Sequence, residues 1–374
     1  MKGRTIILDH LGDIEAAALM VDGQLEDLLV DTPEAARVGT IYRAIADRPV
    51  KGQGGMFLKT PDGSAFLRQI KGLSPGQPLL VQVTGFAEEG KAIPVTNKLL
   101  FKSRYAIITP DAPGLNISRS IRDEPERDRL LEIAHDAMEG AEYGLILRSC
   151  CAGADSEVIS EDIEAMLQLA QTVLNDESTE METLAEGDGP HVLAWRDWVE
   201  KAEVVTAEGG FEEHGVLDAL DALAQDLVPL SGGASMYVEP TRALVAVDVN
   251  TGNDASLAAG IKANMACARA LPRALRLRGL GGQITLDLAP MPKKDRRPFE
   301  TALRAAPSAH AAARTWIWPN GFRVPMRHLR RTPTTSKKPS KRWKTPLPKS
   351  RTSPIPHLVA QRGKMGLDTR ASKP

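Results

Sequence analysis

The sequence predicts an α/β protein of several folding units, one of which is a small β-barrel. A length of 374 residues is typical of two or three such units. Residues 36–103 contain about five short strand-like runs separated by glycine and proline turns, a pattern typical of a small barrel. Residues 244–287 read strand, helix, strand, which is the order of a parallel crossover unit.

The N-terminal region is expected to consist of strands joined by tight turns. Residues 4–8 and 16–30 are strand-like, and the sequence VDGQ within the second stretch places an Asp-Gly turn between two strands. The runs GTIYRAIA, GGMFLKTPDGSAFLRQI and QPLLVQVTGF continue this pattern through the predicted barrel.

The middle of the chain alternates strands with helices. Residues 104–148 read as a strand, a loop, a helix and a strand, an order similar to a βαβ unit. Helices are expected over 158–176 and 190–204, and apolar residues at helical spacing predict a further helix within 214–227.

The last predicted unit contains the crossover. The sequence ASMYVEPTRALVAVDVN (234–250) reads as two strands joined by a turn at EPT. Residues 254–277 form a long helical stretch, interrupted by Pro272. A glycine turn then leads into the strand ITLD at 284–287.

Composition excludes several classes of protein. Apolar residues make up 42% of the chain and charged residues 25%, values that are ordinary for a soluble globular protein. No stretch approaches the ~18 uncharged apolar residues of a membrane span, and acidic residues come too early for a signal-peptide core. We therefore expect no membrane span and a cytoplasmic location.

The three cysteines, Cys150, Cys151 and Cys267, form no CxxC motif, so neither a disulfide framework nor an all-cysteine zinc site is expected.

The net charge of −1 hides two segments of opposite charge. Residues 315–374 contain 15 lysines and arginines and a single acid, so the first 314 residues carry about −15. Residues 154–226 are the most acidic part and would repel polyphosphates. The proline-rich composition of about 320–374 predicts disorder. This tail is either a basic RNA-binding extension or the product of a shifted reading frame.

Two aspartates end the two strands of the crossover unit. Asp248 follows the apolar run LVAV, and Asp287 ends ITLD. If these strands are adjacent and parallel, both carboxylates lie at the same edge of the sheet, where open α/β sheets bind ligands. Mg²⁺ fits such a pair, because it takes oxygen ligands and commonly binds one or two carboxylates together with phosphate and water. Asn250 is placed to orient a carboxylate or a bound water.

Simpler explanations exist for these charged residues. An aspartate at a strand end commonly caps the next turn or helix, although two of them separated by one crossover are a more specific pattern. The basic sequence KKDRR at 293–297 could neutralise substrate phosphates or could be a solvated charged face.

The sequence resembles the ribonuclease E/G family in several spaced motifs. VDVNTG (247–252), the stretch from Asn264 to Met291 and the hairpin sequence VPLSGGASMYVEPTRAL (228–244) are similar to that family's catalytic region. The resemblance implies that Asp248 and Asp287 hold a catalytic Mg²⁺ and that Asn250 is the third catalytic residue. It covers about residues 1–306. The CPxCxG motif that links protomers of the larger members through zinc has no counterpart here, so an oligomer would form without that link.

The resemblance also assigns roles in RNA binding. GTIYRAI and MFLKTPDGSAFL are similar to the family's S1 barrel, an OB-type fold, in which Phe57 and Phe66 match two RNA-stacking aromatics and Lys91 matches a lysine near the RNA. Without the resemblance, the two phenylalanines would be read as barrel core. NISRSI (116–121) and GLILRS (144–149) resemble a pocket for a 5′-monophosphate, which Arg148 and Ser149 would bind.

The resemblance further implies how the units are arranged along the chain. The S1 barrel would be inserted in an RNase H-like α/β unit, and a DNase I-like catalytic unit would follow. The expected segments are the first RNase H-like strands (1–35), the barrel (36–103), the 5′-phosphate sensor (104–190), the rest of the RNase H-like unit (191–226), an incomplete catalytic unit (227–314) and the basic tail (315–374).

Two functions are compatible with these observations. The first is a Mg²⁺-dependent endoribonuclease that cleaves single-stranded RNA in RNA processing or decay and senses a 5′-monophosphate. The second is a non-catalytic RNA-binding relative with a degenerate catalytic end and a basic tail.

Overall fold

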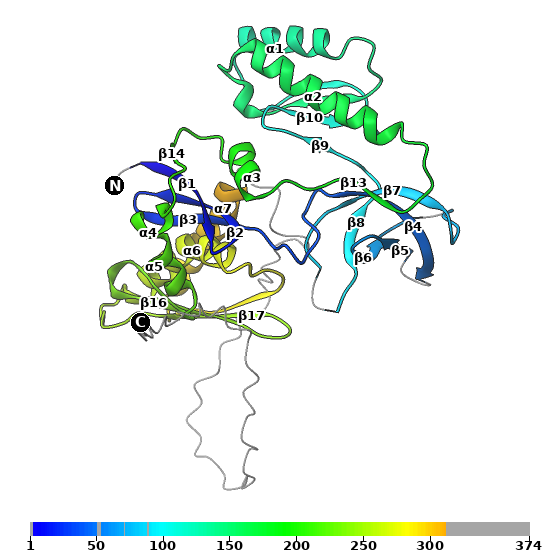
Figure 1. Cartoon of the computed structure of the whole chain (residues 1–374). Helices are drawn as coiled ribbons and strands as arrows, with labels where there is room; N and C mark the ends of the chain where they lie inside the picture. Colours follow the sequence, from blue (N-terminus) through cyan, green and yellow to red (C-terminus); the bar gives the residue numbers. More distant parts are fainter. Residues whose placement is uncertain (1–2, 51–53, 71, 88–89, 312–374) are drawn as a thin grey trace, which may run out of the picture. The chain divides into compact units, whose positions relative to one another are not determined.

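The computed structural model describes residues 3–50, 54–70, 72–87 and 90–311, and its elements are drawn in Figure 1. The basic tail at 315–374 lies outside the described residues, so its expected disorder stays a prediction. Among the described helices, none has the length and apolar character needed to cross a membrane.

The first sheet joins the start of the chain to a much later segment. Its strand order is β14-β1-β2-β3, and the pairing of β14 with β1 is parallel. The strands are β1 (Arg4–Leu11), β2 (Ile14–Val21), β3 (Gln24–Val30) and β14 (Glu203–Val205). Helices pack on both faces: α4 (Gly210–Glu213) and α5 (Val216–Leu223) on one, and α3 (Pro190–Asp197) on the other. The chain between β3 and α3 is therefore an insertion relative to this sheet, although the RNase H-like assignment stays a prediction.

The predicted barrel is confirmed as a closed five-stranded barrel, which fits an OB-type fold. Its strands are β4 (Ile41–Val50), β5 (Gly55–Thr60), β6 (Gly63–Leu67), β7 (Pro78–Val83) and β8 (Ile93–Thr96). They pair in the order β4-β5-β6-β8-β7, and a further pairing of β4 with β7 closes the barrel. β13 (Glu182–Ala185) joins β4 from outside the barrel. Alternate residues such as Met56 and Leu58 fill the interior, as the period-two pattern of a strand requires.

The third unit differs from the expected βαβ order. Its sheet has the order β11-β12-β10-β9. The strands are β9 (Phe101–Lys102), β10 (Ala106–Thr109), β11 (Leu115–Ile117) and β12 (Gly144–Leu147). The two strands that the sequence predicted, β10 and β12, are antiparallel. The parallel partner of β12 is β11, a strand of three residues without periodicity that lies in the stretch predicted to be a loop.

Two helices of this region match the expected ones, and a third is shorter than expected. α1 (Glu124–Ala137) and α2 (Ser156–Leu174) match the expected helices closely. The helix expected over 190–204 ends at Asp197 and is followed by the strand β14. Its early end is understandable, because the next residues pair in parallel with β1 as the edge strand β14, a non-local contact that helical periodicity cannot reveal.

The fourth unit is a sheet in the order β15-β16-β17-β18, with two helices in its core. Its elements are β15 (Leu227–Pro229), the 3₁₀ turn η2 (Ser231–Gly233), β16 (Ser235–Pro240), β17 (Val245–Asn250), α6 (Ala259–Leu277), β18 (Ile284–Asp287) and α7 (Lys293–Ala311). The predicted crossover is confirmed, since β17 and β18 are parallel and adjacent. α6 runs through Pro272 without the expected interruption, and Leu271 and Pro272 are both buried, so packing outweighs the lost backbone hydrogen bond.

Candidate active site and RNA-binding surface

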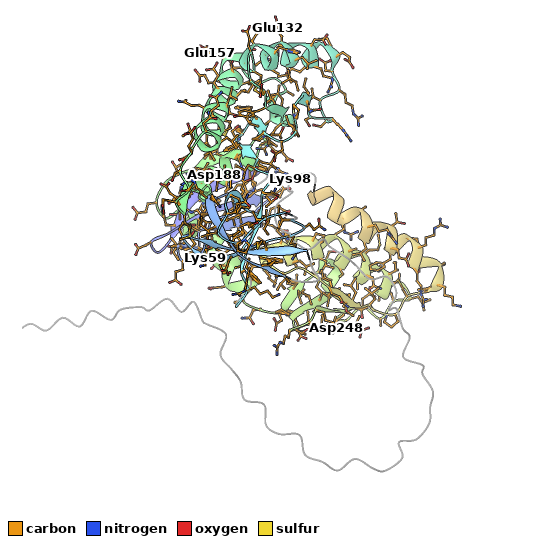
Figure 2. All side chains as sticks on the ribbon, turned by 90° about the vertical axis from the view of Figure 1, so that its right-hand side faces the viewer. Lys59, Lys98, Glu132, Glu157, Asp188 and Asp248 are labelled. Carbon is orange, nitrogen blue, oxygen red and sulfur yellow. The ribbon has the colours of Figure 1, made fainter. Side chains whose placement is uncertain are left out.

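Asp248 and Asp287 are direct partners in the parallel pairing of β17 with β18. Paired residues on neighbouring strands project from the same face of a sheet, so the two carboxylates leave the sheet side by side. Both residues are exposed, and Figure 2 labels Asp248 at the surface of this unit. The structure thus places the two acids as the sequence pattern predicted.

Strict alternation along β17 produces this orientation. Val245, Val247 and Val249 are buried against the core, whereas Asp248 and Asn250 are exposed on the opposite face. The amide of Asn250 donates a hydrogen bond to Oδ2 of Asp248 at 2.8 Å. This bond fixes the rotamer of one carboxylate and leaves its second oxygen available to a cation. β17 has a strand on each side, which makes its backbone a rigid support.

Two glycines hold the loop that follows Asn250. Gly252 has a φ of +62°, and a Cβ atom built on it would lie 2.1 Å from the carbonyl oxygen of Gly233. The loop after β17 therefore packs directly on the 3₁₀ turn before β16, with no room for a side chain. The motifs VNTG and LSGG, which resemble family motifs separately, are one packed structure in space.

Asn264 is a positioning residue that the sequence analysis did not single out. Its side chain is fully buried on α6, where Nδ2 donates to the carbonyl oxygen of Ala289 at 2.9 Å and Oδ1 accepts from the Ala289 N–H at 3.1 Å. These two bonds clamp the chain two residues after Asp287. The available signal was an amide among small apolar residues (Ala263, Ala266 and Cys267) on the buried face of a helix.

The donor set around the two carboxylates fits a hydrated Mg²⁺ ion. Within the described ranges, no group of three or more His, Cys, Asp and Glu side chains is placed to hold a metal. A site of two carboxylates would therefore leave the remaining positions to water or to phosphate oxygens, which is the usual arrangement for Mg²⁺. Zinc, which prefers nitrogen and sulfur ligands in a closed tetrahedron, fits this donor set poorly.

The two barrel phenylalanines lie outside the barrel core. Phe57 on β5 and Phe66 on β6 are cross-strand partners, half-buried, with ring centroids 5.2 Å apart. Gly55 makes room for them, because a Cβ there would lie 2.4 Å from the Phe66 ring. The guanidinium carbon of Arg48 lies 4.9 Å from the centre of the Phe57 ring. A cation over an aromatic pair on an outer face is an arrangement suited to stacked bases and backbone phosphates.

Phe57 and Lys91 line the same open groove beside the barrel, whose volume is about 920 Å³. Arg48, which the sequence analysis did not identify, lines it too. Acidic residues also contribute to the groove, among them Asp62 and Glu186. The groove therefore brings two of the three predicted RNA-binding residues together, while Phe66 contacts it through the ring of Phe57.

Arg148 and Ser149 stand in different environments. Arg148 is largely buried: Nη1 donates to the carbonyl oxygens of Ser103 (2.6 Å) and Arg196 (3.0 Å), and Nη2 pairs with Asp197 at 2.9 Å. Ser149 is exposed at the first position of the 3₁₀ turn η1 (Ser149–Cys151). The guanidinium is thus already bound by a carboxylate and two carbonyls, so a phosphate at this residue would meet the negative charge of Asp197.

Cys150 follows directly in this turn and has an unusual environment. Its Sγ donates to the carbonyl oxygen of Arg104 at 2.8 Å. A hydrogen bond from Cys151, with a smaller contribution from the nearby guanidinium groups of Arg148 and Arg104, lowers the pKa of the Cys150 thiol to about 7 against the opposing effect of burial. Burial alone raises the pKa of Cys267, in the core of the unit formed by β15–β18, to about 12.

Comparison with known proteins identifies a family and several relatives of this sequence. Residues 101–205 and 193–315 match the sequence model of the Ribonuclease E/G family. The match therefore continues beyond residue 306, where the resemblance in the motifs ends. The chain is 26% identical over 353 residues to Ribonuclease E of Nostoc sp. (strain PCC 7120), covering 78% of this chain and 51% of that protein. It is 25% identical over 382 residues to Ribonuclease G of Escherichia coli (strain K12), covering 84% and 77%. The chain spans about half the length of the Nostoc protein and of Ribonuclease E of Synechocystis sp. (strain PCC 6803).

Proposed function

Because the chain belongs to the ribonuclease E/G family, we propose that it is a Mg²⁺-dependent endoribonuclease that cleaves single-stranded RNA during RNA processing or decay. The names of the relatives support a nuclease. The observation that carries the proposal is the in-register pair of Asp248 and Asp287 on an exposed face, with Asn250 bound to one of them. A structural role would not require two adjacent like charges, which repel each other unless a cation lies between them.

Each residue of the site has a defined task in this proposal. Asp248 and Asp287 would bind the ion, and Asn250 would keep the Asp248 carboxylate in its binding rotamer. When bound, Mg²⁺ supplies an activated water and stabilises the charge that develops on the phosphate. Lys293 and Lys294, exposed at the start of α7 shortly after Asp287, would attract the RNA backbone to this edge.

The barrel would hold the RNA away from the cleaved bond. Phe57 and Phe66 offer flat ring surfaces for stacking, and Arg48 and Lys91 supply positive charge beside them. Because every base has a π-face, such a surface binds single strands with little demand on sequence. The acidic residues of the same groove would keep the bound backbone close to these cations.

Sensing of a 5′-monophosphate by Arg148 and Ser149 is a separate proposal with a structural condition. The phosphate would compete with Asp197 for the Arg148 guanidinium, while Ser149 donates its exposed hydroxyl. A non-catalytic RNA-binding protein is the second candidate, favoured by the 15 basic residues of the segment 315–374, which follows the end of the family match.

One comparison of variants tests the nuclease. Asp248→Asn and Asp287→Asn should lower cleavage of a single-stranded oligonucleotide in Mg²⁺ at least ~100-fold, since each removes a charged ligand to the ion. Binding of the same RNA, measured by fluorescence anisotropy, should remain within about threefold, because the barrel is unchanged. Asp218→Asn, an exposed aspartate on α5, is the matched control and should cleave normally. A parent protein that binds RNA without cleaving it at any Mg²⁺ concentration would favour the second candidate.

A further inference from the structure

The exposed face of the catalytic sheet carries one continuous row of four side chains. The strand registers pair Leu227 with Tyr237, Tyr237 with Asp248, and Asp248 with Asp287. All four residues are exposed, Tyr237 to 41% and Leu227 to 43%. The row therefore runs across the sheet from two apolar side chains to the two carboxylates of the candidate metal site.

The position of Tyr237 differs from that of its neighbours on β16. Met236 and Val238 are fully buried and belong to the core on the other face of the sheet. Tyr237 alternates with them and points away from that core. A tyrosine directly opposite Asp248 has its Cβ roughly 5 Å from the Cβ of that aspartate, so Tyr237 is the neighbour of Asp248 on the side away from Asp287.

We propose that Tyr237 is the stacking surface for the nucleobase next to the cleaved phosphate of a single-stranded RNA. This inference rests on the proposed nuclease function. Tyr237, Asp248 and Asp287 are spaced by single strand separations of about 4.8 Å, so a base attached beside a phosphate at the carboxylates would lie one strand further along the row, over the ring.

The chemistry of the row determines what kind of substrate it accepts. An uncharged aromatic ring can approach a base without bringing further negative charge to an already acidic site, and its π-face is indifferent to the identity of the base. Removing a paired base from a duplex costs free energy, because its pairing and stacking are lost. The row would therefore favour unpaired nucleotides at the cleaved position. Leu227 extends the apolar surface beyond the ring and would exclude water from the base.

Cleavage measurements on modified RNA test the stacking directly. Tyr237→Ala should lower kcat/KM for a single-stranded substrate roughly tenfold, and Tyr237→Phe should not, because stacking needs the ring and not the hydroxyl. An abasic nucleotide beside the cleaved bond should lower the parent's kcat/KM by a similar factor and should add no further loss in Tyr237→Ala. The matched control is Thr285→Val, an exposed residue of the same face in the neighbouring row, which should behave as the parent.

A second measurement does not depend on cleavage. In the Asp287→Asn protein, RNA carrying 5-iodouridine beside the expected cleavage position should photo-crosslink to Tyr237, identified by mass spectrometry. If Tyr237→Ala fails to fold, as judged by circular dichroism, the Tyr237→Leu variant is used in its place in both measurements. Leucine keeps an apolar side chain in the strand but has no flat ring.

The possible failures can be told apart. If Asp248→Asn abolishes cleavage but Tyr237→Ala and Tyr237→Leu cleave as the parent does, the stacking role is wrong and the nuclease stands. If Asp248→Asn cleaves normally, the nuclease assignment fails, and the absence of a crosslink to Tyr237 then overturns the stacking role as well. If light scattering shows a parent dimer that Tyr237→Ala converts to monomer, the row is an interface between two copies and the proposal is overturned.

Discussion

Asn264 holds the backbone of Ala289 through two hydrogen bonds, one to its carbonyl oxygen and one from its N–H. Because Ala289 lies two residues after Asp287, a buried amide on α6 sets where the strand with the second carboxylate ends. The site is therefore supported from beneath the sheet as well as by the pairing of β17 and β18.

Replacing Asn264 with leucine should destabilise the protein and loosen the site. Two buried backbone groups would lose their partners, which we expect to lower the free energy of unfolding by about 2–3 kcal/mol in urea titrations. Cleavage should fall by more than the unfolded fraction explains, because displacement of Asp287 misplaces a ligand. Arg269→Ala, an exposed change on the same helix, is the control. An Asn264→Leu protein with parental stability would contradict this role.

Gly252→Ala and Gly279→Ala separate backbone strain from steric clash. Both glycines have φ near +60°, so both substitutions cost about 1–2 kcal/mol of backbone strain. A Cβ at Gly252 would collide with the Gly233 carbonyl, whereas a Cβ at Gly279 would have no heavy atom within 4 Å. Thermal unfolding should therefore show a larger loss for Gly252→Ala, and Gly252→Ala alone should impair cleavage. Equal losses in the two variants would argue against the packed loop.

Phe57→Ala should weaken the binding of single-stranded RNA roughly fivefold to a hundredfold, the range for one base–aromatic stack. The dependence of affinity on salt should not change, because no charge is removed. Arg48→Ala, in contrast, should reduce the slope of log affinity against log salt by about 0.7 if it contacts one phosphate. Val192→Ala, an exposed apolar change on α3, serves as the control in anisotropy titrations. Unaltered binding by Phe57→Ala would return this residue to a structural role.

Asp197→Asn should strengthen any response to a 5′-monophosphate. The substitution removes the negative charge that Asp197 shares between Arg148 and Arg196 while keeping a side chain of the same shape. We expect the ratio of cleavage rates for 5′-monophosphorylated and 5′-hydroxyl RNA to rise severalfold, and Arg148→Ala to bring this ratio to one. Glu200→Gln, an exposed carboxylate paired with Arg4, is the matched control. A ratio that is the same in the parent and in Asp197→Asn would count against sensing by Arg148.

The cysteines should react with iodoacetamide in a defined order as pH rises. The pKa of Cys150 is lowered to about 7, so its alkylation rate should rise between pH 6 and 7 and begin to level off by pH 8, whereas the rate of a thiol with the ordinary pKa of about 8.5 rises nearly tenfold per pH unit. Cys267, whose pKa burial raises to about 12, should remain unmodified in the folded protein. Mass spectrometry after timed labelling at pH 6, 7 and 8 measures both sites, and Cys150→Ser identifies the reactive thiol. A rate at Cys150 that rises nearly tenfold for each pH unit from 6 to 8 would contradict the lowered pKa.

Local periodicity was sufficient to predict much of the candidate active site. The alternation from Val245 to Asn250 places three valines on one face and Asp248 and Asn250 on the other, whatever the strand packs against. A single helix between β17 and β18 then made a parallel pairing the expected topology. The barrel followed for the same reason, since short alternating runs between glycine turns specify strands and their reversals.

Only the tertiary structure decided the features that depend on partners distant along the chain. The sequence shows Arg148 and Asp197 but not their ion pair, which joins residues 49 positions apart. β11 and β14 exist because each finds a neighbouring strand, and neither carries a periodic pattern of its own. The alignment of Tyr237 with Asp248 required the register of β16 against β17. Hydrogen-bond register and burial are properties of the folded chain. Which residues become neighbours in space is therefore decided by folding and not by their spacing in the sequence.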